Sequence, residues 1–291
     1  MKISLSGLLR LTPLLLAFSL LISPTVKAEI SESALAGMER QSPINILPEH
    51  TVFTALPPLQ FNFNSDTALN VVNTGSPDPE KSLRANVNSG AGKLMVSGHE
   101  WDLAQFHFHT PAEHLLNGVK APMEMHLVFS DPSSSNLLVV GRWINVTSSP
   151  NSALDPIFSH LPQTTSDTLN IDHFNLNTLL PATLESFRYE GSLTTPPFSE
   201  NVSWVDLAQP LGLSQGQIDS FRTLFPEGNA REVQDLHGRL VQTDVTGFAT
   251  AVPEPQTYAM ILAGLCLIAW RTSSRTRRQQ RTSQNISLGV A

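Results

Sequence analysis

The segment that decides the fold is Gln105-Phe106-His107-Phe108-His109, in which every second residue has the same character. Successive side chains of a β-strand point to opposite faces, so this alternation predicts a strand with Gln105, His107 and His109 on one face. Phe106 and Phe108 then lie on the other face, where aromatic rings pack in a core. Two imidazoles opposite an aromatic core face indicate a chemical site on a sheet.

A second segment, Met123-Glu124-Met125-His126-Leu127-Val128-Phe129, alternates in the same way. Glu124, His126 and Val128 share one face, and the apolar residues between them share the other. Antiparallel pairing of the two segments would bring His126 level with the two histidines of the first strand. The sequence therefore predicts a cluster of three imidazoles.

Three neutral imidazoles offer three corners of the tetrahedron that Zn²⁺ prefers and leave the fourth for water, which is typical of a catalytic zinc site. The alternative is that each histidine is a hydrogen-bonded core residue, as most strand histidines are. Gln105 and Glu124 flank the histidines and are suited to hold the ring N–H groups of metal ligands, which favours zinc.

A rigid loop is predicted at Gly191-Ser192-Leu193-Thr194-Thr195-Pro196-Pro197, because two prolines restrict the chain and remove two backbone donors. Most such loops are structural. The hydroxyl groups of Thr194 and Thr195, held in a stiff frame, are also suited to orient a small nucleophile.

The rest of the chain reads as sheet with little helix. Short alternating apolar runs such as 137–144, broken by frequent prolines and glycines, predict many strands. Short helical pieces are expected at 214–224, where Ser214 can cap the start, and at 155–160. The formal net charge of −7 argues against a nucleic-acid partner, and the single cysteine excludes an intramolecular disulfide.

Residues 1–28 have the pattern of a signal peptide. Lys2 and Arg10 give a basic start, residues 11–22 are apolar, and Val26-Lys27-Ala28 offers a site for signal peptidase. The alternative is a transmembrane helix, but the apolar stretch is short for a bilayer. The sequence therefore predicts export to the periplasm, the cell surface or the medium.

The C-terminal end carries Val252-Pro253-Glu254-Pro255, then the apolar run 258–270, then a basic cluster. The run is short for a hydrocarbon core of roughly 30 Å, and the basic residues favour the cytoplasmic side. Residues 252–281 resemble a PEP-CTERM sorting tail. That resemblance implies transient membrane association and cleavage by an exosortase-type protease in a Gram-negative bacterium; a plain membrane anchor is the alternative.

Between these ends the sequence predicts one domain at residues 40–245. Residues 29–39 and 246–251 are expected to be linkers, and residues 282–291 a disordered tail.

The predicted domain resembles the α-class carbonic anhydrases, in the form of their bacterial branch. The segments that carry the resemblance, in family order, are QSPINI (41–46), QFHFHTPAEH (105–114), MEMHLVF (123–129), GSLTTPP (191–197), Trp204 and NAREVQDLHGR (229–239). The resemblance implies a mainly β (α+β) fold. It has one large, mostly antiparallel twisted sheet of about ten strands, short peripheral helices and zinc in a conical cavity.

The same resemblance implies a zinc lyase that reversibly hydrates carbon dioxide to bicarbonate and a proton, by attack of zinc-bound hydroxide. The zinc ligands would be His107, His109 and His126. Their ring N–H groups would be oriented by Gln105, Glu124 and the main chain near Asn229. Thr194 would accept a hydrogen bond from the hydroxide and donate one to Glu113. The substrate pocket would be formed by Val128, Leu193, Thr195, Val202 and Trp204.

The sequence departs from the family at the proton shuttle. Many relatives carry a histidine in an N-N-G-H segment, whereas Ser76 stands in that place within residues 71–77. A serine does not accept a proton near neutral pH, and direct release to water is limited to roughly 10³ s⁻¹. The sequence therefore predicts a slow enzyme that depends on external buffer, unless His99 or His114 serves instead. The alternative function is a zinc-binding or structural extracellular protein with little activity.

Overall fold

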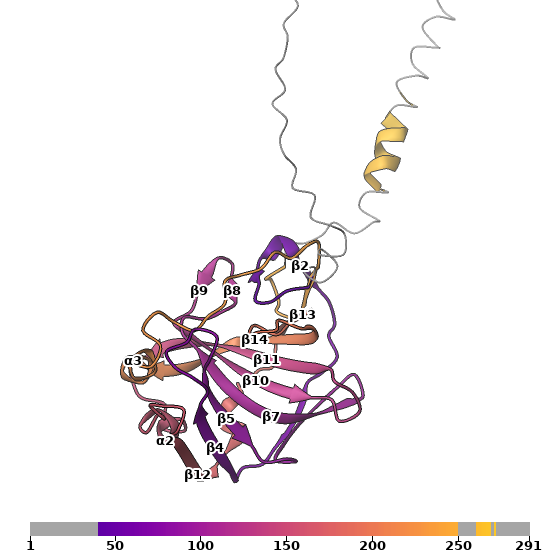
Figure 1. Cartoon of the computed structure of the whole chain (residues 1–291). Helices are drawn as coiled ribbons and strands as arrows, with labels where there is room; N and C mark the ends of the chain where they lie inside the picture. The colour runs from indigo at the N-terminus through magenta and orange to yellow at the C-terminus, as the bar shows by residue number, and fades with distance from the viewer. Residues whose placement is uncertain (1–39, 250–259, 269–270, 272–291) are drawn as a thin grey trace, which may run out of the picture. The chain divides into compact units, whose positions relative to one another are not determined.

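The computed structural model describes residues 40–249, 260–268 and 271. Their main feature is one strongly twisted sheet of twelve strands (Figure 1). In order across the sheet, the strands are β12 (Thr168–Phe174), β4 (Thr67–Asn73), β5 (Leu83–Val87), β7 (His99–His109), β10 (Met123–Ser130), β11 (Leu137–Thr147), β14 (Glu200–Ser214), β13 (Ser186–Ser192), β15 (Val241–Thr243) and β2 (Thr51–Phe53), with β6 (Gly92–Val96) beside β7 and β3 (Gln60–Phe63) beside β6.

The sheet is mixed. Strand β11 runs parallel to β14, and β15 runs parallel to β2, whereas the other neighbouring pairs in this sheet are antiparallel. The prediction of a large, mostly antiparallel sheet of about ten strands is therefore confirmed.

The remaining elements are short. A second sheet joins β1 (Asn45–Ile46), β8 (Leu115–Leu116) and β9 (Val119–Lys120), and the helices are η1 (Pro48–His50), α2 (Asp155–Phe158), η2 (Leu176–Leu179) and α3 (Gln215–Arg222). Ser214 caps α3, because its side chain accepts from the Gln217 backbone amide and its own backbone amide donates to Gln217 Oε1. Both helices expected from the sequence are thus present.

The alternation of β7 and β10 divides their side chains between the two faces of the sheet. Phe106, Phe108, Met125, Leu127 and Phe129 are at most 2% exposed and lie in one apolar cluster. Each side chain of this size stabilises the fold by about 1.5–3 kcal/mol when fully buried. This packing fixes the register and directs the three histidines to the opposite face.

The packed domain extends past the predicted boundary at residue 245. The ring centroid of Phe248 lies 4.7 Å from that of Phe187. Phe248 thereby packs against a second apolar cluster, which consists of Ile44, Ile46, Ala112, Val139, Trp143, Phe187, Tyr189, Val202, Trp204 and Val241. Residues 246–249 are therefore part of the fold, because the side chain of Phe248 packs against this apolar cluster.

The predicted signal peptide, the predicted linker 29–39 and most of the sorting tail lie outside the described residues. Residues 260–268 of the tail are helical. In the part of the chain that the structure describes, no helix is both long and apolar enough to span a membrane.

Candidate metal centre

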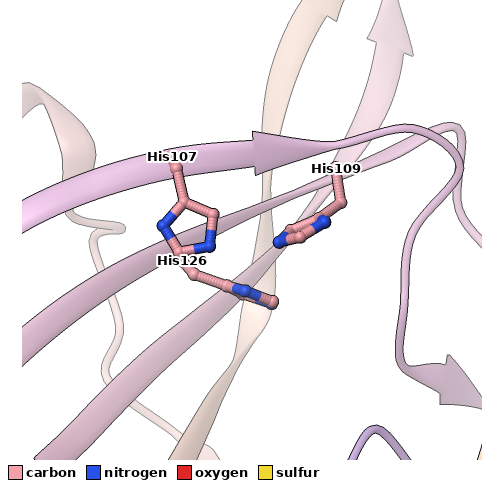
Figure 2. A group of neighbouring side chains, drawn as sticks. All are labelled: His107, His109 and His126. Carbon is pink, nitrogen blue, oxygen red and sulfur yellow. The ribbon is translucent and has the colours of Figure 1, made fainter. Parts of the chain in front are cut away.

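Three histidines from β7 and β10 meet on one face of the sheet. The two strands pair antiparallel, with His126 opposite His107 and Glu124 opposite His109. The ring centroids are 4.9 Å apart for His107 and His109, 5.2 Å for His107 and His126, and 4.7 Å for His109 and His126. Figure 2 shows the three rings converging, and one nitrogen from each lies within 4.8 Å of the others.

Each ring is held by one nitrogen, so that the other is left free. The contacts are His107 Nδ1 to Gln105 Oε1 at 2.9 Å, His109 Nδ1 to Asn229 O at 2.8 Å and His126 Nε2 to Glu124 Oε1 at 2.8 Å. Because each partner is an oxygen that accepts, the ring nitrogen that it holds is the donor. The lone pairs therefore lie on Nε2 of His107, Nε2 of His109 and Nδ1 of His126.

The electrostatics of the cluster favour neutral rings. Burial lowers the pKa of His107 well below its ordinary value, and the neighbouring His109 and His126 lower it further. Burial also lowers the pKa of His109. Neutral imidazole is the form that binds a metal.

The donor set fits zinc. Nε2 of His109 is buried and has no hydrogen-bond partner among the described residues, which is costly unless a ligand takes its lone pair. Three imidazole nitrogens and one open position are the set found in catalytic zinc sites. The group His114, Glu124 and His126 is equally close, but its atoms already bond to one another at 2.8 Å, so it supports the site.

Behind the rings lies a buried polar network. His114 Nδ1 lies 2.8 Å from Glu124 Oε1, and its Nε2 lies 2.6 Å from the Tyr189 hydroxyl, which donates to Ser42 Oγ. Burial alone would lower the pKa of His114, but the carboxylates of Asp206 and Glu124 outweigh burial and raise it to about 9. His114 is fully buried. It therefore holds Glu124 in place through their hydrogen bond and does not exchange protons with solvent.

Glu113 and Thr194 are both buried, and Glu113 lies beside the histidines. Glu113 Oε1 accepts from the Arg231 amide at 2.8 Å, and its Oε2 lies 3.8 Å from His126 Nδ1. Among the described residues, Oε2 has no hydrogen-bond partner, and no hydrogen bond joins Thr194 to Glu113. One buried carboxylate oxygen is thus left available for a donor.

Four of the five predicted pocket residues lie together in the second apolar cluster. Val202 and Trp204 are buried in it, and Val128 and Leu193 pack against it. The Trp204 ring centroid is 4.9 Å from that of His126, and its Nε1 donates to Ser192 O. The fifth residue, Thr195, lines a cavity together with His107.

This cavity has a volume of about 240 Å³. Its lining consists of Thr74, Glu80, Lys81, Ser82, Arg84, Gln105, His107, Thr195 and Pro196. Ser76, which the family resemblance places at the shuttle position, does not line it. Its hydroxyl accepts from the Asn73 side chain, which also accepts from the amides of Gly75 and Ser76, so this turn folds onto Asn73.

His99 also lies away from the metal centre. Its Nε2 is 3.3 Å from Asp131 Oδ1, its ring packs on Trp101, and it lines a separate cavity of about 630 Å³. Sequence reasoning instead missed Lys81 and Arg84. The alternation around Arg84, between buried Leu83 and Ala85, was a signal for its outward face, but only the pairing of β5 with β7 places it opposite His107.

The comparisons with known proteins agree with this geometry. Residues 28–245 match the family described as eukaryotic-type carbonic anhydrase, and residues 251–278 match the PEP-CTERM protein-sorting motif. The carbonic anhydrase of Neisseria gonorrhoeae is 34% identical over 203 residues, which cover 70% of this chain and 77% of the relative.

Solved structures agree as well. The α-carbonic anhydrase of Photobacterium profundum aligns with a TM-score of 0.64 and 32% identity over 70% of this chain and 89% of its own. That of Thermovibrio ammonificans, in complex with the inhibitor sulfanilamide, aligns with a TM-score of 0.64 and 34% identity over 70% and 87%. The chain belongs to the α-class carbonic anhydrase family and is an enzyme of that class, with a PEP-CTERM sorting motif at its C-terminus.

Proposed function

We propose that the chain reversibly hydrates carbon dioxide to bicarbonate and a proton with zinc held by His107, His109 and His126. The observation that carries this proposal is the convergence of three imidazoles, each held through one nitrogen and free at the other. Zinc, when bound, lowers the pKa of a coordinated water to about 7, a value known from carbonic anhydrases themselves, and so makes hydroxide available at neutral pH.

Gln105, Glu124 and the Asn229 carbonyl keep the three rings in the tautomers that zinc binding needs. Their oxygens accept from the ring N–H groups, so each free nitrogen stays aimed at one point. His114 adds to this by holding Glu124 in place. We assign these residues to orientation of the ligands.

Thr194 and Glu113 orient the nucleophile. The unpaired Oε2 of Glu113 is an acceptor for the Thr194 hydroxyl. Once Thr194 donates there, its own oxygen can only accept, which directs the hydrogen atom of the nucleophile towards Thr194 and a lone pair towards carbon dioxide.

The apolar wall made by Val128, Leu193, Val202 and Trp204 binds the substrate. Carbon dioxide carries no net charge and no donor, so an apolar surface beside the nucleophile holds it without competing hydrogen bonds. Thr195 lies apart from this wall, on the lining of the small cavity.

Proton release is the slow part of the cycle. His107 is the one histidine on the lining of the small cavity, and as a zinc ligand it has no nitrogen to spare for the proton. Ser76, His99 and His114 lie elsewhere. The proton therefore passes to external buffer, since release to water is limited to roughly 10³ s⁻¹.

The two ends of the chain act in export. Signal peptidase removes residues 1–28, and an exosortase-type protease cleaves near residues 252–255 while the tail 252–281 is associated with the membrane. The sorting motif supports delivery to the cell surface, and the composition of the ends supports a Gram-negative envelope.

Stopped-flow hydration of carbon dioxide by the full chain in mild detergent, with zinc content measured on the same sample, tests the proposal. A rate that requires zinc, disappears on chelation and grows with buffer concentration supports it. Full zinc occupancy without a rate above background would instead indicate a zinc-binding or structural protein with the carbonic anhydrase fold.

A further inference from the structure

The small cavity carries two basic side chains beside the metal centre. Lys81 lies in the loop that joins β4 to β5, and Arg84 lies in β5, opposite His107 of β7. Both line the same cavity as His107 and Thr195. The two exposed basic residues therefore share a cavity with one of the three histidines.

The backbone of this loop is tied to the metal centre. Asn229 Nδ2 donates to Lys81 O and to Phe108 O, at 3.0 Å in both cases, while the Asn229 carbonyl holds His109. The Lys81 side chain runs over Gly75, where an added Cβ would lie 3.1 Å from Lys81 Cγ. Asn229, which orients His109, thus also holds the backbone at Lys81.

Neither positive charge is neutralised by a neighbour. Within the part of the chain that the structure describes, no hydrogen bond or ion pair engages the Lys81 ammonium or the Arg84 guanidinium. Glu80 is the acid on the cavity lining, against two cations. A concave site with an excess of one charge concentrates ions of the opposite charge.

We propose that Lys81 and Arg84 bind a divalent oxyanion at the cavity mouth and that this anion is the proton acceptor of the reaction. Hydrogen phosphate is the test case. Hydration of CO₂ by H₂O gives HCO₃⁻ and H⁺; HPO₄²⁻ takes up that proton and leaves as H₂PO₄⁻, and no bond to phosphorus forms or breaks. This inference rests on the proposed hydration activity and names the partner that completes it.

The charges also explain release of the protonated anion. Attraction between the two cations and the anion scales with the anion's charge, which protonation halves. The protonated form is therefore held less strongly than the basic form and dissociates more readily. A neutral acceptor such as imidazole gains nothing from Lys81 and Arg84, so the two buffers separate this effect from simple proton capacity.

The experiment compares phosphate with imidazole as the buffer in stopped-flow hydration by the zinc-loaded full chain, at constant pH and ionic strength. The variants are Arg84→Gln, Lys81→Gln and the double substitution. Lys120→Gln is the matched control, because Lys120 is an exposed lysine on β9 that does not line this cavity. We expect the double variant to lose about tenfold in the phosphate-supported rate and to keep the imidazole-supported rate.

A second readout does not use activity. Titration of inorganic phosphate into the zinc-free chain should shift the NMR amide signals of Lys81 and Arg84, and the double variant should show no such shifts. Equal phosphate rates in the wild type and the double variant, with no phosphate-induced shifts, would overturn the inference. Absence of any hydration at full zinc occupancy, with the shifts present, would instead refute the proposed activity and leave the anion site standing.

Discussion

The metal centre and the neighbouring cavity mouth, which is formed by Lys81 and Arg84, differ in how their side chains are held. The centre consists of the half-buried His107 and the buried His109 and His126 on two paired strands, and each imidazole is held by an oxygen partner. The mouth consists of exposed basic side chains without such partners, carried by a loop and an adjacent strand. The fold therefore holds the histidines in place through their oxygen partners, whereas the exposed charges of Lys81 and Arg84 stay available to solutes.

The largest expected effect comes from breaking the centre itself. His109→Ala should abolish stoichiometric zinc binding and lower the hydration rate by more than about 10³-fold, because two imidazoles leave zinc without its third protein ligand. Zinc analysis of the purified variant and stopped flow measure both effects. His160→Ala, at an exposed histidine, is the control; retention of one zinc per chain in His109→Ala would remove His109 from the ligand set.

The next effect concerns the buried network behind the centre. The pKa of His114 is raised in the folded protein to about 9, against an ordinary value near 6.5. Its contribution to stability is therefore complete below about pH 6.5 and is lost as the pH rises through about 9, up to about 3 kcal/mol.

Urea unfolding of the zinc-free chain at pH 6.5 and pH 9.5 measures this loss. The wild type should lose more stability over this interval than His114→Gln, whose side chain does not titrate. The same loss in both proteins would show that the pH dependence arises elsewhere.

A smaller effect is expected from the oxygens that orient the ligands. Gln105→Leu removes the acceptor for His107 Nδ1 and should weaken zinc binding by about 10–100-fold. Gln105→Glu keeps an acceptor and should stay closer to the wild type. Competition with a chelator gives the zinc affinity, and equal affinity in the leucine variant would contradict an orienting role for Gln105.

The smallest effect on zinc affinity is expected from a substitution in the cavity mouth. Arg84→Gln should change zinc affinity by less than about twofold, because its exposed charge is screened and donates to no ligand. The same chelator competition checks this. A loss as large as that of Gln105→Leu would mean that the mouth and the centre are one structural unit.

Much of the centre was predictable from the sequence. The alternation in residues 105–109 and 123–129 predicts two strands whose apolar faces pack in the core, and the pairing of His126 with His107 follows when they run antiparallel. The polar residues beside the ligands, Gln105 and Glu124, could be assigned because their contacts lie two positions away along a strand.

The mouth could not be predicted in this way. Its loop is shaped by the side chain of Asn73, and Lys81 is held by Asn229, which is far away in the sequence. The assignment of Ser76 to the shuttle position stays a prediction, since the structure shows only that Ser76 contacts Asn73 and does not line the small cavity. Parallel pairing of β11 with β14 was likewise invisible, because local alternation carries no information on which distant strand is the neighbour.

The central claim is that three histidines and zinc make this chain a carbon dioxide hydratase. Its most direct test is the hydration rate of one sample carried through zinc removal with a chelator and zinc return, followed by stopped flow. The account predicts that the rate disappears with the metal and returns in proportion to zinc bound, up to one ion per chain. A rate that survives complete zinc removal, or that fails to return at full occupancy, would contradict it.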